Sequence, residues 1–458
     1  MSFPRPAERD PATREKRESR GNDLDCPVKP GNDKSEIVHH LNMRLTKIGV
    51  LSLGCPRNLV DSQSISGRWS AKGYEIVDIK DADVGFVNTC SFIEDARRES
   101  IDAILELARL KKEGRLKKII VGGCLSQRYK EKLLPALKEV DAFVGRVELD
   151  DKNQGSYSLL PKHFAYLKIA EGCNHPCSFC VIPKIKGRLK SRKMASIIEE
   201  VRRLDREGKA EINLIGQDLS HYGLDIYKKP RLAVLAGKIA RQLGNVRWLR
   251  LLYLYPDNID DELLDLISGH SRICKYLDLP LQHINDRILK RMKRGMDKKK
   301  IRVLLDKARK KIPGVAIRTS LIVGFPGETD REFKELFKFV REQRFERLGV
   351  FKYSREEGTP AFGYQNQIPE KVKQARFDDL MRLQQEISLE FNQGFLGKET
   401  EVLIDEKESE GVYLGRMGID APDVDGSVYV RAAKSLKPGD FVKVKITDIY
   451  EYDLAGEL

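Results

Sequence analysis

Short apolar runs alternate with stretches of helical periodicity in the first half of the chain. Three mostly apolar runs stand out, at residues 47–53, 84–87 and 119–121. A run that is apolar on both faces indicates a buried strand of a parallel sheet. The pattern therefore predicts an N-terminal α/β domain with a parallel sheet over residues 44–155.

The same alternation continues over residues 159–391. Six strand-like runs occur there, at residues 165–170, 211–215, 248–254, 276–281, 316–323 and 348–353. Charged helical segments separate them, at residues 196–206, 261–267, 301–310 and 330–343. Strand–helix alternation implies a parallel sheet. Six units predict a partial (β/α)6 barrel whose working face lies at the carboxyl ends of the strands.

The pattern changes after a charged helix that we expect over residues 371–393. Val, Ile and Tyr then alternate with polar residues between Gly turns, at residues 401–404, 411–415, 426–430 and 441–446. This alternation predicts a small antiparallel β-barrel over residues 392–458. Residues 1–43 have no periodicity, and we expect them to form a disordered tail.

Length and composition exclude several classes of protein. The 458 residues suggest two to four domains, and 41% hydrophobic residues exclude a wholly disordered chain. The sequence contains no apolar run of about 18 residues and no secretory signal, so we expect a cytoplasmic protein without membrane contact. Eight cysteines are too few for a disulfide scaffold in a chain of this length. Clustered cysteines in a reducing compartment indicate metal ligands or catalysts instead.

Three cysteines follow the first strand of the expected barrel with the spacing C-x3-C-x2-C: Cys173, Cys177 and Cys180. Thiolates are the usual ligands of iron–sulfur clusters, and three of them leave one iron of a [4Fe–4S] cluster open. A zinc site usually has four ligands with paired C-x2-C spacing, which this triplet fits poorly. We therefore predict a [4Fe–4S] cluster at the mouth of the barrel, with Phe179 placed to shield it.

Three more cysteines, Cys55, Cys90 and Cys124, stand just after the three strands expected in the N-terminal domain. Ligands of open α/β sheets bind beyond the carboxyl ends of the strands, so the three thiols are expected at one edge. Small residues flank each cysteine and leave room for an inorganic group, although a single free cysteine is often only a buried apolar residue. We predict a second [4Fe–4S] cluster whose open iron carries an exogenous sulfur ligand. Cys274 is expected to be a buried thiol, and Cys26 is given no role.

The Cys173–Cys180 segment resembles the radical S-adenosylmethionine (SAM) superfamily. The resemblance implies reductive cleavage of SAM to methionine and a 5′-deoxyadenosyl radical. Two segments match positions where this superfamily contacts SAM: Gly324, Phe325, Pro326, Gly327 and Glu328 near the adenine, and Gln217 and Asp218 near the methionine part. A turn before a helix and a helix cap are the alternative interpretations of these two segments.

Two three-cysteine sets, a radical SAM barrel and a small C-terminal β-barrel together resemble the radical SAM methylthiotransferases over about residues 44–458. This resemblance implies two [4Fe–4S] clusters, a C-terminal TRAM domain, and SAM used both as methyl donor and as radical source. Residues 53–62, 171–175 and 252–256 look like the RimO-type branch, which methylthiolates the β-carbon of an aspartate in a small-subunit ribosomal protein. The tRNA-directed branches have Gln-Met in place of Pro56-Arg57 and Ser/Thr-x-x-Pro in place of residues 252–256.

Charge is unevenly distributed along the chain. The net charge is +14, but residues 397–458 carry 8 basic and 14 acidic side chains, with Asp420, Asp423 and Asp425 in one loop. This acidic end favours a basic ribosomal protein as partner, whereas the basic middle favours rRNA, tRNA or an acidic electron donor such as flavodoxin. Two alternatives stay open: a tRNA adenosine methylthiotransferase, and a non-catalytic iron–sulfur protein that binds RNA or carries electrons.

Overall fold

The computed structural model describes residues 47–147, 157, 159, 161 and 163–458. The tail expected over residues 1–43, with Cys26, lies outside these residues. In the part of the chain that the structure describes, no helix is long and apolar enough to cross a membrane.

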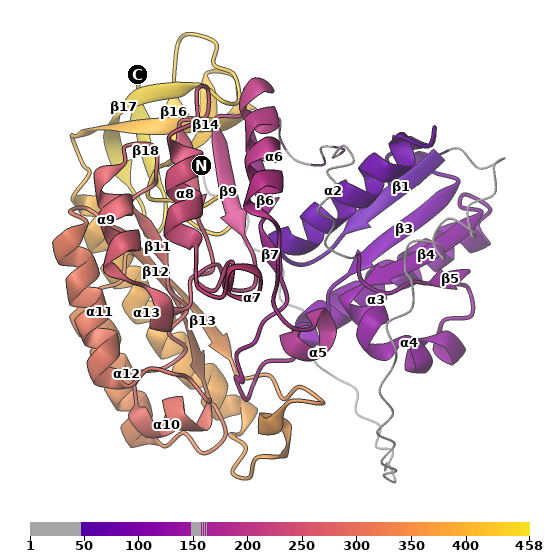
Figure 1. Cartoon of the computed structure of the whole chain (residues 1–458), viewed down its shortest axis with the longest axis horizontal. Coiled ribbons are helices and arrows are strands. Elements are labelled where there is room, and N and C mark those ends of the chain that lie inside the picture. Colours follow the sequence, from indigo (N-terminus) through magenta and orange to yellow (C-terminus); the bar gives the residue numbers. More distant parts are fainter. Residues whose placement is uncertain (1–46, 148–156, 158, 160, 162) are drawn as a thin grey trace. The chain divides into compact units, whose positions relative to one another are not determined.

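The N-terminal domain contains a five-stranded, all-parallel sheet with the order β2-β1-β3-β4-β5 (Figure 1). Its strands are β1 Lys47–Ser52, β2 Glu75–Val77, β3 Val84–Thr89, β4 Lys118–Gly123 and β5 Ala142–Phe143. The three strands expected from the apolar runs are confirmed as β1, β3 and β4, which are neighbours in the sheet. The two short edge strands, β2 and β5, were not expected.

Helices cover both faces of this sheet. They are α2 Pro56–Ser70, α3 Glu94–Lys112 and α4 Cys124–Ala136, and a 3-10 turn η1 Ile79–Asp81 lies beside β1. Ile65 and Trp69 of α2 pack against Phe86 on one face. Ile104 of α3 and Leu133 of α4 belong to the core on the other face. These buried positions fix the orientation of each helix on the sheet, and with it the place of the helix's first turn at the sheet edge.

The central domain is a partial barrel of six parallel strands, as the sequence predicted. The strands are β6 Phe164–Lys168, β9 Glu211–Ile215, β10 Trp248–Leu251, β11 Tyr276–Asp278, β12 Ala316–Val323 and β13 Arg347–Lys352. They form the sheets β10-β9-β6 and β11-β12-β13, which a bridge between Leu249 and Ile273 joins. A short antiparallel pair, β7 Ala170–Glu171 with β8 Lys190–Ser191, brackets the cysteine triplet.

Helices connect successive barrel strands. They are α5 Ile182–Lys186, α6 Met194–Arg206, α7 Leu224–Tyr227, α8 Leu232–Ala240, α9 Asp261–Gly269, α10 Asp286–Arg291, α11 Lys298–Lys311 and α12 Asp330–Gln343, with 3-10 turns η2 Pro256–Asn258 and η3 Pro360–Gly363. Asp260 caps α9 by accepting from the Leu263 N–H (2.9 Å), and Thr329 with Glu332 forms a capping box at α12. Such caps satisfy free N–H groups at helix starts. The expected linking helix is α13 Glu370–Gln393.

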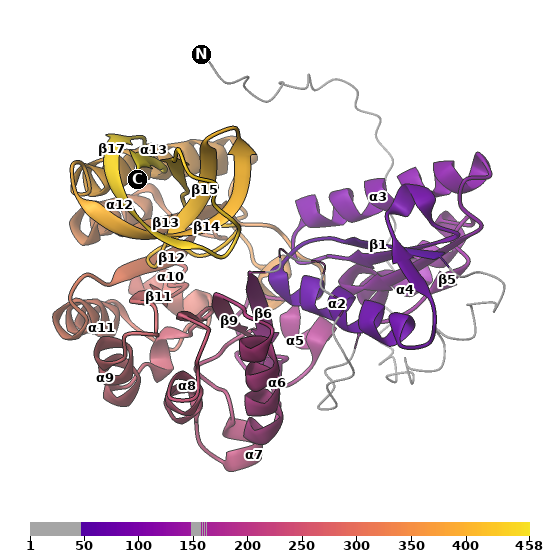
Figure 2. The ribbon, with the colours of Figure 1, turned by 90° about the horizontal axis from the view of Figure 1, so that it is seen from above.

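The C-terminal domain is a closed five-stranded barrel with the order β14-β15-β16-β18-β17 (Figure 2). Its strands are β14 Glu399–Ser409, β15 Val412–Met417, β16 Val428–Arg431, β17 Phe441–Ile449 and β18 Leu454–Glu457. The antiparallel barrel is confirmed, and one of its five pairings, β16 with β18, is parallel. Val402, Val430 and Val444 fill its core.

Residues 416–425 of this barrel lie against the amino-terminal parts of the central strands. Each of the six strands contributes one side chain: Tyr166 binds Asp423 (2.8 Å), Glu211 binds Arg416 (2.9 Å), Arg250 donates to the Gly418 carbonyl (2.9 Å), Tyr276 and Arg318 bind Asp425 (2.6 and 3.4 Å), and Arg347 binds Asp420 (2.8 Å). The acidic loop that we expected to face a basic partner therefore pairs within the chain. This corrects the argument for Asp420 and Asp425, because Arg347 and Arg318 pair with them inside the chain, whereas Asp423 is exposed and accepts from the Tyr166 hydroxyl.

Candidate active site

Cys55, Cys90 and Cys124 meet at the carboxyl edge of the N-terminal sheet. Cys55 lies just before α2, Cys90 just after β3, and Cys124 at the start of α4. The Cys124 thiol donates to the amide oxygen of Asn58 (3.7 Å), and the Asn58 N–H donates to the Cys55 carbonyl (2.9 Å). Three thiols from three adjacent strand ends thus converge, as the strand positions predicted.

Local backbone geometry holds these three thiols close together. Gly54 has φ +84°, and a Cβ there would lie 2.8 Å from the Cys90 Sγ. Gly123 has φ +93°, and a Cβ there would lie 2.6 Å from the Thr89 carbonyl oxygen. Only glycine tolerates both the positive φ and this close approach. The small residues around the cysteines are therefore required by the way that the strand ends pack.

The protonation of the three thiols differs. Burial raises the pKa of Cys124 to about 12, and burial also raises the pKa of Cys90. Burial acts in the same direction on Cys55, but the guanidinium of Arg57, whose Nε donates to the Cys55 Sγ (3.5 Å), the Asn58 N–H and Lys186 together outweigh it and lower the pKa of Cys55. Because the thiolate is the form that binds metal, Cys55 is the thiol best prepared to bind iron first.

Cys173, Cys177 and Cys180 lie in the loop between β7 and α5, beyond the carboxyl end of β6. The Cys173 N–H donates to the Gly187 carbonyl (3.1 Å), and the Cys180 N–H donates to the Cys177 carbonyl (3.1 Å). Burial raises the pKa of Cys173 to about 11 and that of Cys180 to about 12. Cys173 and Cys180 are thus mostly neutral thiols that need to release a proton before they can bind iron.

Basic and aromatic side chains surround this loop. Arg294 donates to the Cys177 Sγ (3.5 Å) and stacks on the ring of Tyr255 (3.9 Å). Phe179 packs beside the buried Phe325 of the glycine-rich segment after β12. The cysteine loop and that segment therefore share one small core, which brings two of the predicted site segments together.

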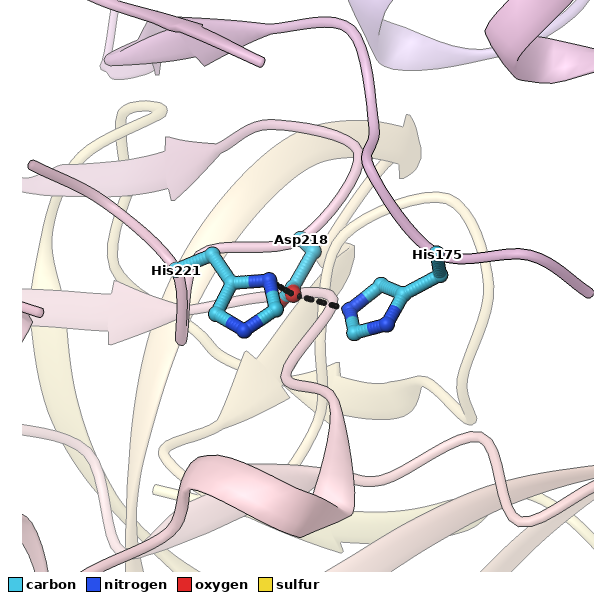
Figure 3. Close-up of side chains that lie close together, drawn as sticks. All are labelled: His175, Asp218 and His221. Carbon is cyan, nitrogen blue, oxygen red and sulfur yellow. Dashed lines mark hydrogen bonds and ion pairs between the residues drawn. The ribbon is translucent and has the colours of Figure 1, made fainter. Parts of the chain in front are cut away.

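His175 and His221 both point at the carboxylate of Asp218 (Figure 3). Asp218 accepts from His175 Nε2 (2.7 Å), His221 Nδ1 (3.0 Å), the N–H and hydroxyl of Ser220 (2.8 and 2.6 Å) and the Tyr255 N–H (3.2 Å). Burial alone would raise the pKa of Asp218, but these donors lower it. The ligand atoms of the three residues lie within 4.8 Å of one another, as they would around a cation. Since five donors already use this carboxylate, its observed role is to tie the cysteine loop to the ends of β9 and β10.

The other residues predicted to contact SAM differ in whether their side-chain oxygens already have hydrogen-bond partners among the described residues. The side-chain oxygen of Gln217 is buried and has no hydrogen-bond partner among the described residues. Glu328 is also buried, but its carboxylate binds the Gly324 N–H and Arg376 (3.2 Å). Gly324 has φ +71°, and a Cβ there would collide with Lys373. Gln217 therefore offers an unused acceptor, whereas Glu328 shapes the backbone of residues 324–328.

Three family models match the chain: Uncharacterized protein family UPF0004 at residues 47–145, the Radical SAM superfamily at 167–340 and the TRAM domain at 396–458. The chain is 46% identical over 439 residues to the ribosomal protein uS12 methylthiotransferase RimO of Thermoanaerobacter sp. (strain X514), which covers 90% of this chain and 100% of that protein. The protein of the same description from Caldanaerobacter subterraneus subsp. tengcongensis is 47% identical, with the same coverage. The chain belongs to the RimO family of radical SAM methylthiotransferases.

A solved structure of the radical SAM methyltransferase TsrM from Kitasatospora setae has 14% sequence identity and a TM-score of 0.47, over 74% of this chain and 89% of that chain. The regions that the three family models match correspond to the parallel sheet, the partial barrel and the closed barrel described above. The family assignment therefore accounts for the two cysteine sets and for the strands that carry them.

Sequence reasoning missed a network of ion pairs between the two cysteine sets of this RimO family member. Asp61 of α2 binds Lys168 of β6 and Lys186 of α5 (3.0 Å). Glu171 binds Lys186 (3.0 Å), Lys168 (3.6 Å) and Arg146 (3.2 Å). Both carboxylates lie in segments that carried the family resemblance, but their partners are distant in sequence. The network joins the N-terminal domain to the barrel directly beside the cysteines.

Arg57 was also missed as a functional residue. Its Nη1 donates to the Gly216 carbonyl after β9 (3.1 Å), and its guanidinium lies over the ring of Tyr253 after β10 (4.3 Å). Its charge acts on the thiols of Cys55 and Cys180, one from each cysteine set. The only signal in the sequence was its place directly after Cys55-Pro56.

Proposed function

We propose that this chain methylthiolates the β-carbon of an aspartate in ribosomal protein uS12. The relatives that carry this description match the chain along 100% of their own length at 46 and 47% identity. The observation that carries the proposal is the convergence of two three-thiol sets, with Arg57 between them. Such a reaction takes place where ribosomes are, and we therefore place the protein in the cytoplasm.

Both cysteine sets fit a [4Fe–4S] cluster with one open iron. Cys55, Cys90 and Cys124 would hold one cluster, because glycines beside them keep space free near the sulfurs. The loop with Cys173, Cys177 and Cys180 would hold the other. Three thiolates leave one iron of a cubane without a protein ligand.

When bound, the clusters and SAM would supply the electron for reduction, the radical that takes a hydrogen atom from the substrate carbon, the methylthio group, and an acceptor for the electron released as the C–S bond forms. The chain itself binds and orients the reactants. Gln217 would offer its free amide oxygen to SAM, and the backbone of residues 324–328 would contact the adenine. Asp218 holds the cysteine loop through His175. Alignment of this kind accounts for much of the rate of a reaction between two bound groups.

Iron content tests the two clusters. The Cys173→Ala/Cys177→Ala/Cys180→Ala protein should cleave no SAM yet keep about four irons, the content of one cluster. Cys274→Ala is the control, because Cys274 is also a free cysteine but lies buried beside Arg250 at the other end of the barrel strands. An unchanged iron content in the triple variant would refute the two-cluster arrangement.

Intact-mass analysis of ribosomal proteins tests the substrate. Ribosomes from cells with and without this gene should differ by about one methylthio group on uS12, and tRNA from the same cells should carry the same modified nucleosides. A change in tRNA nucleosides with unaltered uS12 would contradict the proposal and favour the tRNA branch.

The electron donor is proposed to be an acidic protein such as flavodoxin. Lys290 in the last turn of α10 and Lys293 in the turn after this helix are both exposed, and the guanidinium of nearby Arg294 contacts Cys177. Exposed cations close to a redox centre attract an acidic partner and speed its association. Contact of the basic middle of the chain with rRNA is proposed on the same electrostatic ground.

A further inference from the structure

Arg57 is a half-buried cation for which no carboxylate partner is found in the described part of the chain. Its Nε faces the Cys55 Sγ, its Nη1 faces the Gly216 carbonyl, and its plane stacks on Tyr253. No hydrogen bond is found for its Nη2 among the described residues, and the residue is partly exposed. An arginine in this setting keeps one donor edge available for a planar anion.

Tyr253 is held under the guanidinium by a backbone conformation that tyrosine rarely adopts. Its φ is +63°, in the left-handed region. Its N–H donates to Asp278 (2.9 Å), and its carbonyl accepts from the Leu219 N–H (2.9 Å), so both neighbouring strand ends fix it. Strained residues of this kind collect at binding sites, where the surrounding structure enforces them. The ring is thus a rigid platform for Arg57.

The two carboxylates of the ion network between the cysteine sets are already used. Asp61, four residues further along α2, binds two lysines, and Glu171 binds the same lysines and Arg146. This network has three cations for two carboxylates. Arg57 adds a further positive charge beside Cys55, so the region between the cysteine sets favours anions.

We infer that Arg57, supported by Tyr253, binds the side-chain carboxylate of the substrate aspartate and selects an acidic residue over a neutral base or amide. This inference rests on the proposed function and names the group that recognises the substrate. The β-carbon of aspartate is one bond from its carboxylate. A carboxylate held on the free edge of Arg57 therefore places that carbon beside the cysteine set that includes Cys55.

Binding to the cluster-loaded protein tests the inference without relying on turnover. The probes are a labelled peptide with the target aspartate of uS12 and the same peptide with asparagine, compared by fluorescence anisotropy. The unaltered protein should bind the aspartate peptide about 10- to 100-fold more tightly, as expected for a charge-assisted pair. Arg57→Gln should bind both peptides equally, and Arg57→Lys should keep only part of the preference, because lysine lacks the planar fork.

Two further variants separate recognition from cluster binding. Tyr253→Leu removes the platform without touching Cys55 and should lower the preference several-fold at full iron content. Arg247→Gln removes an exposed arginine that pairs with Glu401 on the C-terminal barrel, and it should leave the preference unchanged.

The outcomes distinguish this inference from the proposed function. If the unaltered protein modifies uS12 while Arg57→Gln and Tyr253→Leu keep the full preference for aspartate, the inference fails and the proposed function stands. If Arg57→Gln loses iron and Tyr253→Leu keeps the preference, Arg57 serves the cluster and the inference also fails. If the unaltered protein modifies tRNA and not uS12, both fail.

Discussion

Two buried lysines converge on Asp61, and replacing this carboxylate by asparagine tests the ion network between the domains. The side chains of Asp61, Lys168 and Lys186 are each only 4% exposed. In Asp61→Asn, these lysines and Arg146 would share the single carboxylate of Glu171. Removing one partner of a buried ion pair costs about 3–5 kcal/mol, because the remaining charge stays desolvated. That corresponds to roughly 100- to 5,000-fold in the folding equilibrium.

Lys186→Met is the matched variant, because it changes the charge balance in the opposite direction. Three cations and two carboxylates become two of each. Asp61 keeps Lys168, and Glu171 keeps Arg146 at 3.2 Å. Methionine also retains most of the apolar stem. We expect Lys186→Met to cost less than about 2 kcal/mol, since it leaves as many cations as carboxylates, whereas Asp61→Asn leaves three cations with one carboxylate.

Urea unfolding of the cluster-loaded protein under argon, followed by tryptophan fluorescence, measures both variants. Trp69 lies on the same helix as Asp61 and reports on its unfolding. Glu106→Gln is the control, because both partners of its pair with Arg109 are 56% exposed and screened by solvent, so this variant should unfold at the same urea concentration as the unaltered protein. The reasoning is refuted if the free energy of unfolding of Asp61→Asn lies within about 1 kcal/mol of that of the unaltered protein. It is also refuted if Lys186→Met is the less stable of the two variants.

Three further outcomes follow from the geometry. Gly123→Ala should reduce iron content and lower the melting temperature, because the added Cβ would meet the backbone of Thr89 at the end of β3. Gly114→Ala, with a similar φ but open space around it, should cost only about 1 kcal/mol. Arg347→Met leaves a buried carboxylate of the C-terminal barrel unpaired and should destabilise the chain by about 3–5 kcal/mol in urea unfolding. Alkylation of the cluster-free protein by iodoacetamide, followed by mass spectrometry, tests the two thiols. Cys55 should be alkylated at a pH below the ordinary cysteine pKa of 9.0, whereas Cys124, with a pKa of about 12, should stay unlabelled until the pH is much higher. Equal labelling of the two thiols would contradict the effect of Arg57.

Most of the strands could be predicted from the sequence because their signal is local. Buried parallel strands are continuous apolar runs, so β1, β3, β4 and all six barrel strands were expected within a few residues. The convergence of Cys55, Cys90 and Cys124 followed from the same reasoning, since each stands at the end of a strand, whereas Cys173, Cys177 and Cys180 were identified by their spacing. The edge strands β2 and β5 were missed because they are only three and two residues long and carry little pattern.

Side-chain pairing could not be predicted, because its partners are far apart in sequence. Asp61 and Lys168 are 107 residues apart, and Arg57 and Gly216 are 159 apart. No periodicity reports such contacts. The acidic loop was misinterpreted for the same reason, since the sequence does not show whether a carboxylate faces solvent or a buried arginine such as Arg347.

The contact between residues 416–425 and all six barrel strands bears on how separable the parts of this chain are. Chain shortening that removed the C-terminal barrel would leave Arg250, Arg318 and Arg347 without the groups that they bind there. Desolvated cations of this kind unfold a domain unless solvent reaches them. The radical SAM barrel is thus no independent module, and its C-terminal neighbour acts as a structural part of the enzyme's interior as much as a surface for partners.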